Sequence, residues 1–140
     1  MNYEELLNFL QNVGKDPSRL IFEDELTGIY NRRFLLQYFQ YKIVWEALTD
    51  HPVSLIMMDL DHFKGINDTY GHPVGDQALI FLAGLLREIS GEKGLPIRYA
   101  GDEFMILLPQ VGKNEALQVA ERILKRVHEE SLPLGKEVHA

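Results

Sequence analysis

Two short acidic clusters are the residues in this sequence best suited to carry chemistry. Asp59 and Asp61 stand where the apolar run 53–60 ends, and Asp102 and Glu103 lie at the tip of a predicted hairpin. Each cluster alone could simply face solvent, because acids are common at strand ends and in turns. An unpaired charge at the end of a buried strand is nevertheless costly unless it is paired or binds a metal ion.

The two clusters would act together if the strand and the hairpin are neighbours in one sheet. Asp59 and Asp102 would then converge at one edge of that sheet. Carboxylates in this arrangement can hold two divalent cations about 4 Å apart, as enzymes of in-line phosphoryl transfer do. Mg²⁺ prefers an all-oxygen, partly hydrated site that bridges to substrate phosphates. The acids therefore indicate a metal-dependent site for phosphoryl transfer.

Three polar residues between the clusters could meet a nucleotide. Lys64 follows Asp59 closely and could reach a phosphate as a point charge. The carboxylate of Asp76 could accept from the N1–H and exocyclic amine of guanine, and the amide of Asn67 could answer O6 or N3. Each also has a local explanation, as a surface lysine, a first-turn aspartate and a helix-capping asparagine.

Composition narrows the possible functions. The chain has 140 residues, 46% of them apolar, which fits one globular domain. Its 14 basic and 21 acidic residues give a net charge of −7, so no general attraction to nucleic acid or to an anionic membrane is expected. The absence of cysteine excludes disulfides, thiolate metal sites and cysteine nucleophiles. The five histidines have no metal-binding spacing, and no Walker or GxGxxG loop is present.

We expect no direct insertion into a membrane. No apolar run approaches the roughly 20 residues that span a bilayer. The start, MNYEELLNFL, lacks the basic region and small-residue cleavage site of a signal peptide. We therefore expect a cytoplasmic domain, whose parent protein could still be tethered to a membrane.

Hydrophobic periodicity predicts the elements that must position these residues. The apolar run 53–60 is predicted to be a central strand covered on both faces, with hairpin arms at 97–99 and 103–108 and a further strand starting at 137–140. A tight helical or looped connection covers 63–71. Helices are expected at residues 3–13, 17–23, 31–48, 75–90 and 113–130. This order predicts an α+β sandwich with helices on one face of an antiparallel sheet.

Three stretches together resemble the GGDEF family, the diguanylate cyclases. They are DELTGIYNRRF (24–34), MDLDHFKGINDTYGHPVGDQAL (58–79) and RYAGDEFMILLP (98–109). The resemblance implies a palm-like, ferredoxin-like fold, an antiparallel-type sheet with helices packed around it, similar to class III nucleotidyl cyclases. It implies a connecting helical segment at 1–23 and a catalytic domain at 24–140 that is incomplete at its C-terminus.

The resemblance also implies roles for individual residues. Asp59, Asp102, Glu103 and the backbone of Leu60 would bind two Mg²⁺ or Mn²⁺ ions per active site, and the three acids would be catalytic. The remaining positions would meet the substrate: the phosphates at Lys64 and around Phe63, guanine at Asn67 and Asp76, and the nucleotide at the Gly101 backbone.

The implied reaction condenses two GTP molecules into cyclic di-GMP with release of pyrophosphate. One subunit holds one GTP, and each 3′-hydroxyl attacks the α-phosphate held by the other subunit. A homodimer is therefore part of the expected mechanism. An upstream sensor domain is expected in the parent protein.

The sequence departs from the family pattern in three places. Ala100 replaces the first glycine of the signature, where its methyl group could crowd the nucleotide or, if a positive φ were needed, cost about 1 kcal/mol. Gly91 and Gly94 occupy the positions of the family's Arg-x-x-Asp product-inhibition motif, so we expect no feedback through it. A strand, a helix with a phosphate-binding lysine and arginine, and a final strand would lie beyond Ala140. The alternative reading is a catalytically impaired module that binds GTP or dimerises as a regulatory element.

Overall fold

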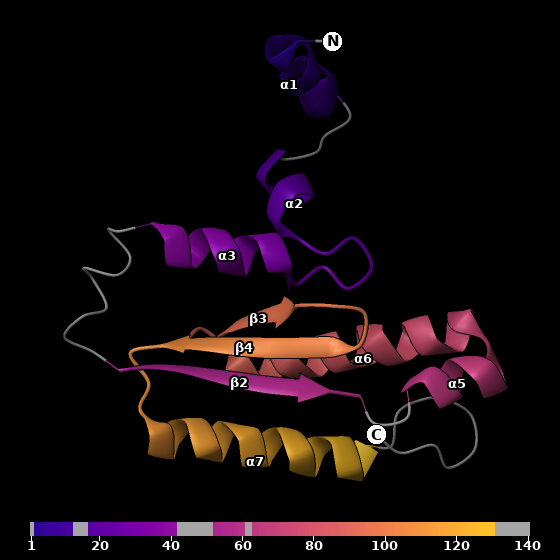
Figure 1. The fold of residues 1–140 in the computed structure, drawn as a ribbon, viewed down its shortest axis with the longest axis vertical. Coiled ribbons are helices and arrows are strands. Elements are labelled where there is room, and N and C mark those ends of the chain that lie inside the picture. Colours follow the sequence, from indigo (N-terminus) through magenta and orange to yellow (C-terminus); the bar gives the residue numbers. More distant parts are fainter. Residues whose placement is uncertain (1, 13–16, 42–51, 61–62, 131–140) are drawn as a thin grey trace.

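The computed structural model of the chain describes residues 2–12, 17–41, 52–60 and 63–130 (Figure 1). These residues form a four-stranded sheet with helices packed around it, which confirms the predicted fold class. Within the described residues, no helix is long and apolar enough to cross a membrane.

The sheet has the strand order β1-β3-β4-β2. The strands β2 (Val53–Asp59), β3 (Leu95–Arg98) and β4 (Glu103–Pro109) pair antiparallel, with β4 between the other two. The two-residue strand β1 (Tyr30–Asn31) pairs parallel to β3, so the sheet is mixed. The antiparallel expectation holds for the three longer strands and fails at β1, which is too short to show a periodic pattern.

Helices α6 (His72–Ser90) and α7 (Lys113–Glu130) cover one face of the sheet. Side chains on a strand alternate between the two faces, and alternate residues of β4 therefore enter this core. Phe104, Ile106 and Leu108 are almost completely buried there, packed with apolar residues of both helices.

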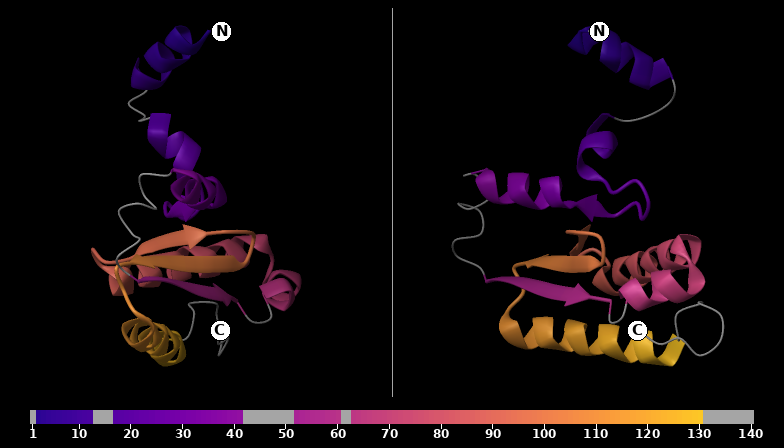
Figure 2. Two further views of the ribbon diagram at one scale, coloured as in Figure 1. Left: turned by 60° about the vertical axis from the view of Figure 1, so that its left-hand side comes forward. Right: turned by 45° about the vertical axis from the view of Figure 1, so that its right-hand side comes forward.

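Helix α3 (Arg32–Gln40) lies over the opposite face, as both views in Figure 2 show. The second core joins Leu35 to Ile97, Met105 and Leu107, with several aromatic side chains of α3 around them. The expectation that all helices pack on one face was therefore wrong. Residues 104–108 of β4 are all apolar, so the alternation of side chains along the strand places apolar groups on both faces. Helix α3 covers the second of these faces.

The remaining boundaries follow the predictions closely. Helices α1 (Tyr3–Asn12) and α2 (Pro17–Phe22) lie where helices were predicted, and α5 (Phe63–Tyr70) is a helix where the sequence had left a helical or a looped connection open. Asn31 caps α3, since its side chain accepts a hydrogen bond from the backbone N–H of Phe34 at 2.9 Å. The rest of the helix predicted at 31–48 falls largely outside the described residues, as does the strand predicted at 137–140.

Candidate active site

The two acidic clusters lie side by side. The β2–β4 register places Asp59 directly opposite Glu103, and the backbone N–H of Leu60 donates to the carbonyl of Asp102 at 3.2 Å. Both Asp59 and Glu103 are exposed, and Asp102 is partly exposed. An open cavity of about 230 Å³ borders this pair, lined by Met57, Met58, Asp59, Glu103, Phe104 and Met105. The sheet thus joins acids that are far apart in the sequence at one edge.

The donor set fits a hard divalent cation. Carboxylate and carbonyl oxygens are the ligands that Mg²⁺ prefers, and Mg²⁺ usually keeps several waters and takes further oxygens from substrate phosphates. In the described part of the chain, no three His, Asp or Glu side chains gather into a metal cluster. Asp61 lies outside the described residues. The side chains at 59, 102 and 103 are therefore donors of a suitable type, and a cation held there would take further oxygens from water or from a ligand.

The family signature, AGDEF at residues 100–104, spans the tight turn between β3 and β4 and the first residues of β4. The backbone N–H of Tyr99 donates to the Glu103 carbonyl at 2.8 Å, and the N–H of Glu103 donates to the Ala100 carbonyl at 3.3 Å. Among the described residues, Gln110 is the only non-glycine residue with positive φ, so Ala100 has an ordinary backbone conformation. The expected strain at this departure from the family pattern does not arise.

Gly101 faces open space. A Cβ added there would meet no atom of the described residues within 4 Å, and the φ of Gly101 is not in the left-handed region. The fold itself therefore does not require glycine at this position. The space beside the turn leaves room for a ligand against the Gly101 backbone.

Helix α5 begins immediately beside the acids. The backbone N–H of Phe63, the first residue of the helix, donates to the carbonyl of Leu60 at 3.4 Å, so the helix begins next to the end of β2. Lys64 is exposed in its first turn. Asn67, one helical turn further, is partly buried, and its Oδ1 atom has no hydrogen-bond partner among the described residues. Asp76 is exposed in the first turns of α6, the next helix.

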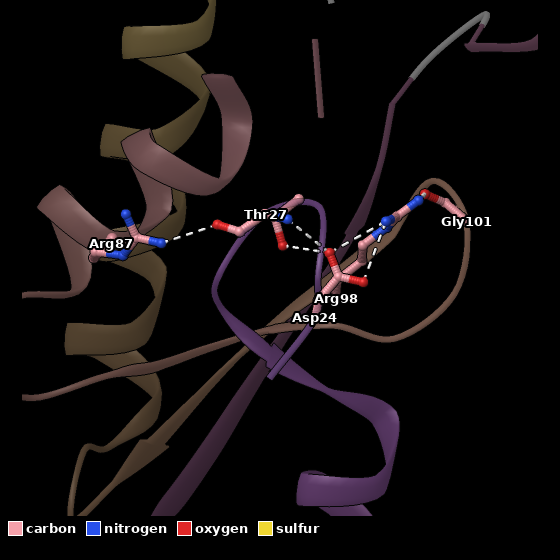
Figure 3. A network of polar contacts seen from close by, with 5 residues as sticks. All are labelled: Asp24, Thr27, Arg87, Arg98 and Gly101. Atoms are coloured by element: carbon pink, nitrogen blue, oxygen red, sulfur yellow. Dashed lines mark hydrogen bonds and ion pairs between the residues drawn. The ribbon is translucent and has the colours of Figure 1, made fainter. Parts of the chain in front are cut away.

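A polar network joins the turn before β1 to the hairpin (Figure 3). The Arg98 guanidinium donates to both carboxylate oxygens of Asp24 at 3.2 Å and, through Nε and Nη2, to the Gly101 carbonyl at 3.1 and 2.9 Å. Asp24 also accepts from the backbone N–H and hydroxyl of Thr27, at 2.9 and 2.7 Å. Arg87 on α6 donates to the Thr27 carbonyl at 3.1 Å.

The balance of effects lowers the pKa of Asp24. Burial is the largest single influence and raises the pKa, but it is outweighed by the hydrogen bonds from Thr27 and by the charge and hydrogen bonds of Arg98. The carboxylate is thus ionised at neutral pH and is held between the turn and the hairpin.

Sequence reasoning placed the acids correctly but missed this network. Asp24 and Thr27 lie in the first of the three recognised stretches and Arg98 begins the third, yet nothing in their spacing shows that they meet. The parallel pairing of β1 with β3, in which Asn31 stands opposite Arg98, brings the two stretches together.

A comparison with known protein families identifies the family of this chain. The family model described as "Diguanylate cyclase, GGDEF domain" matches residues 21–140. The chain belongs to the GGDEF family. This confirms the resemblance found in the sequence, and the metal and substrate roles of the individual residues stay predictions.

Similar proteins agree with this assignment. The response regulator PleD of Caulobacter vibrioides is 37% identical over 130 residues, covering 90% of this chain and 27% of PleD. The diguanylate cyclase DosC of Escherichia coli is 36% identical over 129 residues, covering 91% of this chain and 28% of DosC. The chain thus spans about a quarter of the length of these curated relatives.

Solved structures of GGDEF proteins share the fold. The coiled coil and GGDEF domain of DgcB from Caulobacter crescentus, in complex with c-di-GMP, has a TM-score of 0.78 at 27% identity and covers 97% of this chain and 69% of that one. The diguanylate cyclase SiaD from Pseudomonas aeruginosa, solved with its activator SiaC, has a TM-score of 0.74 at 31% identity and covers 99% and 51% of the two chains.

Proposed function

We propose that this GGDEF domain is a diguanylate cyclase that condenses two GTP molecules into cyclic di-GMP and releases pyrophosphate. The observation that carries the proposal is the pairing of Asp59 with Glu103 across β2 and β4, with Asp102 beside them. Helix α5 begins beside these acids and carries Lys64 in its first turn. The acids proposed to bind metal ions and the lysine proposed to meet phosphate thus belong to adjoining elements of the fold.

The acids would hold the metal ions. Asp59, Asp102, Glu103 and the carbonyl of Leu60 would hold two Mg²⁺ or Mn²⁺ ions, which neutralise phosphate charge and ease deprotonation of the 3′-hydroxyl. Lys64 would add a positive charge at the phosphates. Gly101, where an added side chain would enter open space, would let the nucleotide lie against the hairpin backbone.

Guanine would be recognised at the corner between α5 and α6. The Asp76 carboxylate would accept from N1–H and from the exocyclic amine, which adenine does not present in this arrangement. Asn67 would contribute a hydrogen bond from its amide. Together these contacts would select GTP over ATP.

The reaction would need two copies of the domain. Each 3′-hydroxyl oxygen would attack the α-phosphorus of the GTP held by the other copy, and each α–β phosphoanhydride bond would break. Two 3′–5′ phosphodiester bonds form, and two pyrophosphate ions leave. Catalysis would consist mainly of positioning and charge neutralisation. The ordinary backbone of Ala100 removes one reason for reading the domain as an impaired regulatory module.

The proposal is tested on a version extended beyond Ala140 by the strand, helix and strand that the family pattern predicts, which is incubated with GTP and Mg²⁺ while cyclic di-GMP is measured by chromatography. We expect product, which Asp102→Ala abolishes. Glu121→Ala, which removes an exposed acid on α7, should leave product formation unchanged. GTP binding without product would overturn the catalytic proposal and leave a nucleotide-binding module. Product from Asp102→Ala at the wild-type rate would refute the assigned metal site.

A further inference from the structure

The corner between α5 and α6 brings two residues of different helices into direct contact. Gly71 has a φ of +92° and turns the chain between the helices. The backbone N–H of Gly71 donates to the Asn67 carbonyl at 2.8 Å, and the N–H of Gly75 donates to the Gly71 carbonyl at 3.2 Å. Asn67 and Gly75, each one turn from the corner, therefore lie next to one another.

Gly75 is buried, and its missing side chain leaves room for the Asn67 amide. A Cβ built on Gly75 would overlap Oδ1 of Asn67, lie 2.9 Å from its Cγ and lie 3.4 Å from Cε2 of Phe63. The φ of Gly75 is not in the left-handed region, so its backbone conformation does not require glycine. A side chain at this position would instead need the space that the Asn67 amide occupies.

This packing fixes which end of the amide meets a ligand. Oδ1 of Asn67 is buried against Gly75 and has no conventional hydrogen-bond partner among the described residues. A Cα–H group so close to an oxygen gives at most a weak hydrogen bond. The Nδ2 end of the amide is not among the buried unpaired atoms, so it is the end that can donate to a ligand.

We propose that Gly75 is a positioning residue for guanine binding, acting through Asn67. Because Oδ1 packs against the Cα of Gly75, the amide is held so that Nδ2 donates a hydrogen bond to an acceptor atom of the base, N3 or O6. The inference rests on the proposed function, since it assumes that the base of GTP binds at this corner. It adds that a residue without a side chain sets the orientation of a recognition group.

The test compares two ligands in the presence of Mg²⁺, by isothermal titration calorimetry. GTP should contact both the phosphate site and Asn67, whereas inorganic triphosphate should contact the phosphate site alone. In Gly75→Ala the added methyl group must displace the amide. We therefore expect roughly tenfold weaker GTP binding, the equivalent of about one lost hydrogen bond, and unchanged triphosphate binding.

Two further variants separate positioning from folding. Gly84→Ala is the matched control, because Gly84 lies in the same helix and a Cβ there would meet no described atom within 4 Å. It should change the affinity for neither ligand. In an Asn67→Ala background, which removes the amide, Gly75→Ala should have no further effect on GTP binding.

The outcomes distinguish the inference from the proposed function. If the wild-type chain binds GTP no more tightly than triphosphate, both the proposed function and this inference fail. If the wild-type chain prefers GTP but Gly75→Ala binds it equally well, or weakens both ligands alike, only the inference fails. The inference would also be overturned if Gly75→Ala weakened GTP binding as much in the Asn67→Ala background as it does in the wild-type chain.

Discussion

Arg98 binds the Asp24 carboxylate and the Gly101 carbonyl at the same time. Its guanidinium lies 3.2 Å from both Asp24 oxygens and donates two hydrogen bonds to Gly101, at 2.9 and 3.1 Å. The side chains of the ion pair are only 18% and 20% exposed. The turn that follows the N-terminal helices and the turn that presents Asp102 are therefore connected through one side chain.

Replacing Arg98 by lysine should weaken this connection. An ammonium group cannot present the planar fork that contacts two partners at once, so one partner loses its hydrogen bonds. We expect Arg98→Lys to lower the free energy of unfolding by roughly 2 kcal/mol, measured by urea denaturation. Arg33→Lys, a change at an exposed position of α3, is the control and should have no such effect. Equal urea midpoints for the two variants would contradict the structural role of Arg98.

Stability in acid should depend on Asp24. Its pKa is lowered in the folded chain from the ordinary value of 3.8, so its contribution is present above that value and is lost as pH falls through the lower, folded pKa. Asp24→Asn should therefore reduce stability at neutral pH and flatten the loss of stability below about pH 4. Urea denaturation between neutral and acid pH measures both effects. An acid slope identical to that of the wild type would show that Asp24 does not contribute.

Gly101 and Gly28 should respond differently to the same substitution. Gly101→Ala should leave stability unchanged or raise it by up to about 1 kcal/mol, because the position is open and its φ suits alanine. Gly28 has a φ of +75°, so Gly28→Ala should destabilise the chain by roughly 1 kcal/mol or more. Thermal denaturation measures both changes.

GTP affinity gives the complementary comparison. We expect Gly101→Ala to weaken GTP binding several-fold, since the new methyl group would lie where the nucleotide is proposed to bind. Gly101→Ala with unchanged GTP affinity would show that the nucleotide does not lie against this backbone.

Introducing the family's Arg-x-x-Asp motif at residues 91 and 94 should not create a binding site for cyclic di-GMP. A Cβ at Gly94 would lie 2.8 Å from Cβ of Ser90 and about as close to Ile106 and Leu108, and Gly91 has a φ of +54°. Gly91→Arg combined with Gly94→Asp should therefore lower stability by roughly 1–3 kcal/mol through overpacking. It should not bind cyclic di-GMP tightly. Calorimetry with cyclic di-GMP measures this, and tight binding by the double variant would prove the packing argument wrong.

Much of the fold could be predicted because its longer elements have strong periodicity. Helix α7 was predicted with the same bounds as observed, and the apolar run of β2 indicated a strand. The expectation that this strand is central and covered on both faces was wrong, because β2 stands last in the strand order of the described sheet and its residues Leu55, Met57 and Asp59 are exposed. The parallel strand β1 could not be predicted, because two residues have no period. Nor could the position of α3, since the apolar face of a helix does not show which side of the sheet it covers.

The candidate site was predictable in its residue types and only partly in its contacts. Asp59 and the acids of the hairpin could be matched because Asp59 ends one recognisable strand, Glu103 begins another and Asp102 directly precedes it. The contact between Asn67 and Gly75 depends on the angle at the Gly71 corner, which the order of residues does not specify. Likewise, Arg98 reaches Asp24 only because β1 aligns beside β3.

The link between Asp24 and Arg98 joins residues 74 positions apart, so it bears on how the chain folds. Closing so long a loop is slow and entropically costly, and the Asp24 turn cannot dock before the β3–β4 hairpin exists. During synthesis the Asp24 turn therefore emerges well before Arg98, the residue to which it binds. In the folded protein the turn at residues 24–28 should open locally before the rest of the domain unfolds. Its amide protons should therefore exchange with solvent sooner than those of β4.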